Sequence, residues 1–132
     1  MNYHDFLLTI KEKFANTFIA IDTLFSSHDD VITFVKQFYL RNHFFIDDIL
    51  DFREYKIANQ KVTFDNFVDL YYNEGARKTF EQMFYFKIED EDAKMFELYI
   101  MNDKNKLLTI FNHLQENVNL NPIKLLLTMN VE

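Results

Sequence analysis

The fold is decided first by residues 3–25, which read YHDFLLTIKEKFANTFIAIDTLF. Large apolar or aromatic side chains recur in this stretch at steps of 4, 3, 4, 4, 3 and 4 residues. The residues at these steps are Tyr3, Leu7, Ile10, Phe14, Phe18, Ile21 and Phe25. This spacing places all seven on one stripe of a helix and therefore predicts a long amphipathic helix.

A second helix is expected to follow directly. Ser26 and Ser27 end the first stretch, and Ser27 with Asp30 three residues later resembles a capping box. The second apolar stripe runs through Val31, Phe34, Val35, Phe38, Phe45, Ile49 and Phe52. Asn42 occupies a position on this stripe where an apolar residue is due, so it predicts a bend or a polar contact. Residues 53–62 lose the periodicity and are predicted to form the longest connector.

Further helices are indicated by their end signals. Thr63 opens a third helix, and Gly75, the only glycine, lies where a left-handed residue would close it. Residues 76–87 are predicted to be helical, and Asp103 is expected to cap the next helix, which carries an i, i+3, i+4, i+7 apolar pattern. Asn121 and Pro122 predict the start of a short final helix that runs through residue 126.

Residues 83–101 allow two interpretations. Phe84, Phe86 and Ile88 alternate with polar or partly polar side chains, which is compatible with a β-hairpin. We favour helices, because the intervening turn lacks Gly or Asn and residues 90–92 supply the acidic side chains that a helix N-terminus prefers. The sequence thus predicts an all-α protein, a compact bundle of five or six helices in a single domain over residues 1–132. The alternative is an α+β fold with a hairpin around 83–101.

Aromatic residues dominate the apolar composition, with 16 Phe, 7 Tyr and no Trp. Each buried aromatic side chain removes on the order of 150–250 Å² from water, so a domain of this size has difficulty hiding all of them. One interpretation is a bulky aromatic core, and the other is an exposed aromatic patch that a partner covers. The second interpretation predicts a homodimer formed through the first helix or through Tyr39 and Phe44.

The chain is acidic, with 21 Asp and Glu against 14 Lys and Arg and a formal net charge of −7. Direct binding to nucleic acid is not expected, because it requires clustered basic residues. Two acidic clusters are candidate contacts for a partner protein with a basic surface. They comprise Asp47, Asp48 and Asp51, and then Glu89, Asp90, Glu91 and Asp92. The alternative interpretation is that both are solvated faces or helix N-termini.

No motif for catalysis or for a cofactor is found in the sequence. A single glycine does not allow a glycine-rich phosphate loop or a nucleophile elbow. His43, Asp47 and Asp51 share one helical face and could ligate a divalent ion, but no second helix supplies a partner motif. We therefore expect no enzymatic activity, no metal and no cofactor.

The cellular location is predicted from what the chain lacks. It contains no cysteine, which is compatible with a reducing compartment. Its uninterrupted apolar runs reach only about four residues, far fewer than the ~20 of a membrane helix, and its N-terminal stretch does not resemble a secretion signal. A cytoplasmic protein is expected.

Residues 71–82, YYNEGARKTFEQ, resemble a stretch in the small helical subunit of type III CRISPR effector complexes. The resemblance covers a dozen residues. It rests on the tyrosine pair, the glycine that follows it and the lysine after that glycine. The basic N-terminal helix start of that family has no counterpart here. This resemblance implies, as one alternative, a small subunit of a larger nucleoprotein complex.

The expected function is that of a non-enzymatic interaction protein. Phe, Ile, Lys, Asn and Tyr, whose codons are AT-rich, make up 58 of the 132 residues, which indicates an AT-rich bacterial, phage or plasmid genome. Small, acidic helical proteins without motifs are common among phage and mobile-element inhibitors, anti-CRISPR proteins included. We expect an inhibitor or modulator of a host nucleic-acid-processing or defence protein. A structural or regulatory subunit that acts by homo-oligomerisation is the alternative.

Overall fold

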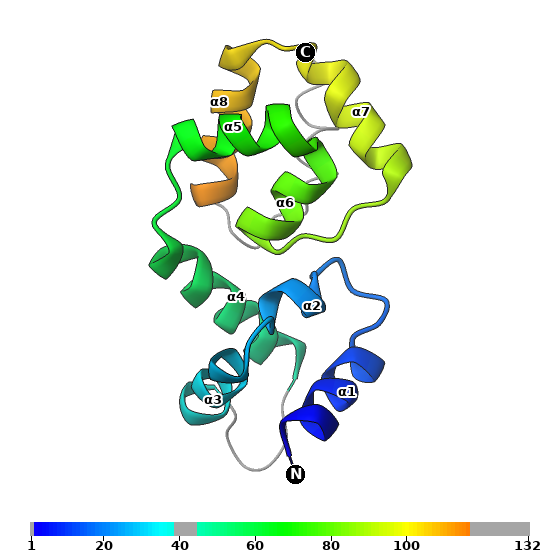
Figure 1. Cartoon of the computed structure of the whole chain (residues 1–132), viewed down its shortest axis with the longest axis vertical. Coiled ribbons are helices and arrows are strands. Elements are labelled where there is room, and N and C mark those ends of the chain that lie inside the picture. The colour runs from blue at the N-terminus through cyan, green and yellow to red at the C-terminus, as the bar shows by residue number, and fades with distance from the viewer. Residues whose placement is uncertain (1, 39–44, 117–132) are drawn as a thin grey trace.

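The computed structural model describes residues 2–38 and 45–116, and this part of the chain is all-α, as predicted (Figure 1). Eight helices lie within these residues. They are α1 (Tyr3–Lys13), α2 (Ile21–Leu24), α3 (His28–Gln37), α4 (Ile46–Gln60), α5 (Phe64–Glu74), α6 (Ala76–Phe84), α7 (Asp90–Ile100) and α8 (Lys104–Glu116). The number of helices exceeds the predicted five or six because neither of the first two apolar stripes forms one continuous helix. The first stripe is divided between α1 and α2, and the second between α3 and α4.

The predicted long helix over residues 3–25 is divided. Helix α1 ends at Lys13, and the chain then runs without regular helix to Ala20 before the short α2 begins. Ile19 forms an isolated antiparallel bridge with Phe86. The Ala20 amide donates to the carbonyl of Tyr85 at 2.8 Å, and the Lys87 amide donates to that of Phe18 at 2.6 Å. These long-range backbone bonds replace the helical ones that the spacing predicts.

The second predicted helix is also interrupted, although its start is confirmed. The Ser27 hydroxyl accepts from the Asp30 amide and the Asp30 carboxylate accepts from the Ser27 amide, which completes the capping box of α3. Helix α3 ends at Gln37, and Asn42 lies outside the described residues. Helix α4 begins after Phe45 and continues to Gln60, so the predicted connector over 53–62 is wrong.

The second half of the chain follows its end signals closely. Thr63 caps α5 by accepting from the Asn66 amide, and Gly75, with a φ of 89°, ends α5 and precedes α6. Asp103 accepts from the Asn105 amide at the start of α8. The hairpin alternative around 83–101 is wrong, because Tyr85 ends α6 in a left-handed conformation and residues 90–100 form α7. The helix expected over residues 121–126 lies outside the described residues.

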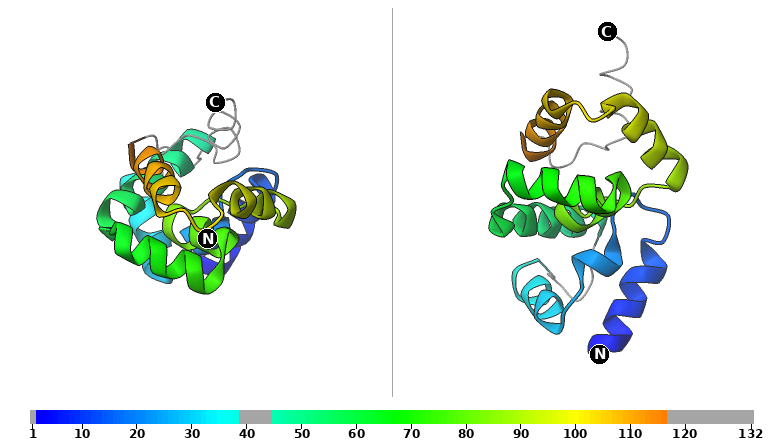
Figure 2. Two further views of the ribbon diagram at one scale, coloured as in Figure 1. Left: turned by 90° about the horizontal axis from the view of Figure 1, so that it is seen from above. Right: turned by 45° about the horizontal axis from the view of Figure 1, so that its top comes forward.

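In space the helices form two groups joined by α4 (Figures 1 and 2). Helices α1, α2 and α3 lie at one end of the molecule, and α5 to α8 lie at the other. The first group packs on an aromatic cluster in which the rings of Phe25 and Phe52 are 5.1 Å apart and those of Phe25 and Phe34 are 5.4 Å apart. Helix α4 therefore contributes to the core of the first group while its C-terminal end leads into the second.

The second group has an aromatic cluster of its own. The rings of Phe80 and Phe96 are 4.7 Å apart, and those of Phe67 and Phe111 are 5.3 Å apart. Among the described phenylalanines, Phe45 alone is classed as exposed. The interpretation as a bulky aromatic core is therefore confirmed for the part of the chain that the structure describes.

Candidate functional site

The outer face of α4 carries a row of carboxylates. Asp47, Asp51 and Glu54 are all exposed and follow one another at helical spacing, whereas Ile49 and Phe52 face the core. None of the three carboxylates has a salt-bridge partner among the described residues. We call Asp47, Asp51 and Glu54 the α4 acidic stripe.

The structure changes the membership of this predicted cluster. The carboxylate of Asp48 accepts a hydrogen bond from the Phe45 amide at 2.7 Å and is half-buried, so it stabilises the start of α4, and its contact with a partner stays a prediction. Glu54 was missed, because residue 53 begins the segment predicted as a connector. The steps of 4 and 3 residues from Asp47 to Asp51 to Glu54 are the sequence signal that could have found it.

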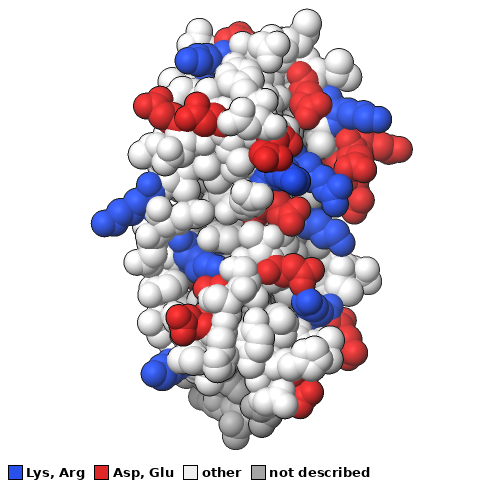
Figure 3. Space-filling model, in the orientation of Figure 1, with Lys and Arg blue, Asp and Glu red and all other residues white. Residues whose placement is uncertain are grey.

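The second predicted cluster lies at the N-terminus of α7, in the other group of helices (Figure 1). Glu89, Asp90 and Glu91 are exposed and Asp92 is half-buried. Asp90 pairs with Arg77 of α6 at 3.0 Å. Red and blue side chains intermingle on this side of the molecule (Figure 3). The structure therefore does not unite the two predicted clusters in one patch, and the α7 cluster is partly neutralised by its neighbours.

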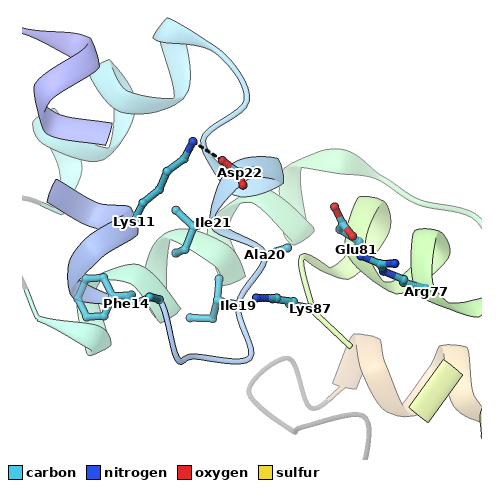
Figure 4. A pocket seen from close by; sticks show the side chains of 10 residues that line it. Lys11, Phe14, Ile19, Ala20, Ile21, Asp22, Arg77, Glu81 and Lys87 are labelled. Carbon is cyan, nitrogen blue, oxygen red and sulfur yellow. Dashed lines mark ion pairs between the residues drawn. The ribbon is translucent and has the colours of Figure 1, made fainter. Parts of the chain in front are cut away.

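A pocket lies where the segment after α1 meets α6 (Figure 4). Its volume is about 350 Å³. The buried side chains of Phe14, Ile19, Ala20 and Ile21 form part of its wall. The volume matches the lower end of the range that small-molecule sites occupy, although more of the exposed lining is polar than apolar.

Charged side chains border the same pocket. Lys11 forms an ion pair with Asp22 on one side, and Arg77, Glu81 and Lys87 lie on the other (Figure 4). The Glu81 carboxylate accepts from a threonine hydroxyl of α2 at 3.2 Å. Three cations thus meet two lining carboxylates, and Asp90 next to the pocket pairs with Arg77, so the charges around the site are balanced. Sequence reasoning missed this site, because its residues come from three separate segments.

A buried basic side chain stands between the two groups of helices. Arg53 of α4 is fully buried, and its Nε donates to the carbonyl of Phe84 at 2.7 Å. Its guanidinium carbon lies 3.8 Å from the centre of the Phe86 ring. Nη1 and Nη2 have no hydrogen-bond partner in the part of the chain that the structure describes. Burial lowers the pKa of Arg53 from 12.5 to about 9.

The remaining predicted residues are only partly placed. Tyr39 and Phe44, proposed for a homodimer, and His43, the candidate metal ligand, lie outside the described residues. The homodimer stays a prediction. Within residues 2–38 and 45–116 no three His, Asp or Glu side chains come together as a metal site would require. No described helix has the length and apolarity needed to cross a membrane.

Comparisons of the chain with protein-family models, with curated proteins and with solved structures find no match.

Proposed function

We propose that this protein is a non-enzymatic binding protein that modulates a partner protein with a basic surface. The observation that carries the proposal is the α4 acidic stripe. Its three carboxylates are exposed and unpaired among the described residues, and they stand on a 15-residue helix whose opposite face is held in the core by Ile49 and Phe52. A fixed row of like charges attracts and orients a partner of opposite charge.

The same charges support one class of partner. Carboxylates at helical spacing can occupy the basic groove in which a nucleic-acid-processing protein holds phosphates. The net charge of −7 disfavours contact with nucleic acid itself, since phosphates would be repelled. The proposal is therefore an inhibitor or modulator of a host nucleic-acid-processing or defence protein, comparable in its mode of action to anti-CRISPR proteins.

Affinity capture with a matched pair of variants tests this proposal. The stripe variant combines Asp47→Asn, Asp51→Asn and Glu54→Gln. The control combines Glu12→Gln, Asp65→Asn and Asp69→Asn, which removes the same charge from exposed positions of α1 and α5. We expect the wild-type chain and the control to capture the same basic protein from host extract at low salt, and the stripe variant to lose it. Capture should also weaken steeply as salt is raised.

A competition assay then decides the mode of action. The captured protein should bind nucleic acid in a gel-shift assay, and addition of the wild-type chain should displace that nucleic acid. Equal capture by the stripe variant and the wild type, or a captured protein without basic surface charge, would contradict the proposal.

A further inference from the structure

The pocket between the segment after α1 and α6 has a wall that backbone bonds hold in place. The Ala20 amide donates to the Tyr85 carbonyl at 2.8 Å, and the Lys87 amide donates to the Phe18 carbonyl at 2.6 Å. Phe18 also packs on Phe86, with ring centres 5.5 Å apart. The site is therefore formed before any ligand enters, which lowers the cost of binding.

Lys87 and Arg77 present cationic groups at the pocket, while Asp22, Glu81 and Asp90 balance the total charge around it. Asp22 is paired with Lys11, and the Glu81 carboxylate accepts a hydrogen bond from a threonine hydroxyl of α2. Lys87 is exposed and forms no salt bridge with any described residue. Arg77 uses Nη1 for Asp90 in an exposed pair, so its other N–H donors remain open to a ligand. Exposed pairs of this kind contribute little stability and exchange readily.

We propose that this pocket binds a small organic anion, a molecule with one carboxylate, sulfonate or phosphate group attached to an apolar body. The anionic group contacts Lys87 and Arg77, and the apolar body lies against Phe14, Ile19 and Ile21. Charge-assisted hydrogen bonds to the cations and burial of the apolar body act together. This inference goes beyond the proposed function, because it concerns a small molecule and a surface that does not include the α4 acidic stripe.

Two dyes that differ chiefly in charge provide the test. The first is 1-anilinonaphthalene-8-sulfonate, and the second is N-phenyl-1-naphthylamine, which has the same rings without the sulfonate. Titration of the full chain, followed by fluorescence, should show saturable binding of one molecule of the sulfonate per chain. The neutral dye should bind at least about fivefold more weakly, because it lacks the charge-assisted contacts. Equal affinity for both dyes, or binding that does not saturate, would overturn the proposal.

Matched variants locate the site. Lys87→Gln should weaken sulfonate binding by about five- to tenfold, whereas Lys94→Gln removes the same charge from an exposed position of α7 and should leave affinity within about twofold. Ala15→Trp, at an exposed position that lines the pocket, should block entry of both dyes. Circular dichroism melts confirm that each variant is folded.

The inference fails if Lys94→Gln weakens sulfonate binding as much as Lys87→Gln, or if Ala15→Trp leaves dye binding unchanged. Capture of the basic partner by Lys87→Gln should be normal, which separates this result from a failure of the proposed function.

Discussion

Arg53 and Lys56 lie within one turn of α4, yet their positive charges meet two different surroundings. Both side chains donate to a backbone carbonyl at 2.7 Å, Arg53 to Phe84 and Lys56 to Leu24. Both also lie over an aromatic ring, at 3.8 Å from the centre of Phe86 for Arg53 and 4.8 Å from the centre of Tyr85 for Lys56. The carbonyl and the ring are thus common to both sites.

The difference lies in the counter-charge and in access to water. Lys56 pairs with Asp30 at 3.1 Å, and its side chain is 16% exposed. Arg53 is 0% exposed, and among residues 2–38 and 45–116 it forms no salt bridge and has two nitrogens without hydrogen bonds. Removal of a charge from water without a compensating partner is unfavourable. We therefore expect Lys56 to stabilise the fold through its charge and Arg53 to stabilise it through the volume and shape of its side chain.

The largest effect is expected from Arg53→Ala. It removes a large, fully buried side chain between the two groups of helices and leaves a cavity. We expect the free energy of unfolding to fall by about 3–5 kcal/mol, as for other large-to-small core substitutions. Urea unfolding measures this change. Asp51→Ala, at an exposed position of the same helix, serves as control and should change stability by less than about 0.5 kcal/mol. A loss below about 1 kcal/mol for Arg53→Ala would contradict the assignment of volume as its main contribution.

Lys56→Met should have the next largest effect. It leaves Asp30 half-buried without its cation, at an expected cost of about 1–2 kcal/mol. A double-mutant cycle with Asp30→Asn measures the coupling between the two charges. We expect the double variant to lose less than the sum of the two single losses. Strict additivity would show that the ion pair does not stabilise the fold.

Arg53 and Tyr85, whose ring lies under Lys56, should change the free energy of unfolding in opposite directions as the pH rises. Burial lowers the pKa of Arg53 to about 9, so above this pH the unfolded chain binds more protons than the folded one, and the contribution of Arg53 to stability rises. Burial, and then the charge of Asp30, raise the pKa of Tyr85, so its contribution is present below pH ~10 and is lost as pH rises through the raised value.

Comparison with Arg53→Met isolates the arginine contribution. The unfolding free energy of the wild type minus that of the variant should increase by roughly 1 kcal/mol between pH 9 and pH 10. Tyr85 is present in both proteins and largely cancels. A difference that stays flat or declines over this interval would contradict the lowered pKa of Arg53.

The smallest effect is expected from Arg53→Met itself at neutral pH. Methionine keeps much of the buried volume and removes the unpaired N–H groups, which offsets the hydrogen bond lost at the Phe84 carbonyl. The free energy of unfolding should stay within about 1 kcal/mol of the wild type. If Arg53→Met loses as much stability as Arg53→Ala, the charge itself is required and the comparison with Lys56 fails.

The helix ends could be predicted from the sequence because local chemistry determines them. The Ser27–Asp30 capping box, the Thr63 and Asp103 caps and the position of Gly75 all depend on side chains within a few residues of the backbone groups they satisfy. Gly75 adopts a positive φ that a side chain would strain. The same signals correctly favoured α7 over a hairpin.

The errors have one physical cause, which is long-range packing. Residues 14–20 keep a helical spacing of apolar side chains but bond instead to residues 85–87, far away in the sequence. The C-terminal part of α4 was missed because its inward position is occupied by Arg53, and a charged residue breaks an apolar pattern. Glu54 was missed for the same reason, because it lies in the part of α4 that was predicted as a connector.

The pocket could not be predicted, because its residues are neighbours only in the folded chain. Lys11, Asp22 and Lys87 belong to three segments that carry no common motif. The α4 acidic stripe was partly predicted, since Asp47 and Asp51 lie on one helix and their spacing can be counted.

The backbone bonds between residues 18–20 and 85–87 also govern the order in which the chain folds during synthesis. The backbone bonds of residues 18–20 cannot form until Tyr85, Phe86 and Lys87 have left the ribosome, so this segment is fixed well after it is translated. At a synthesis rate of about 5–20 residues per second, the apolar side chains of residues 18–20 stay exposed on the nascent chain for several seconds. Nascent chains arrested before residue 85 should therefore be captured by chaperones, and release should follow once residues 85–87 emerge.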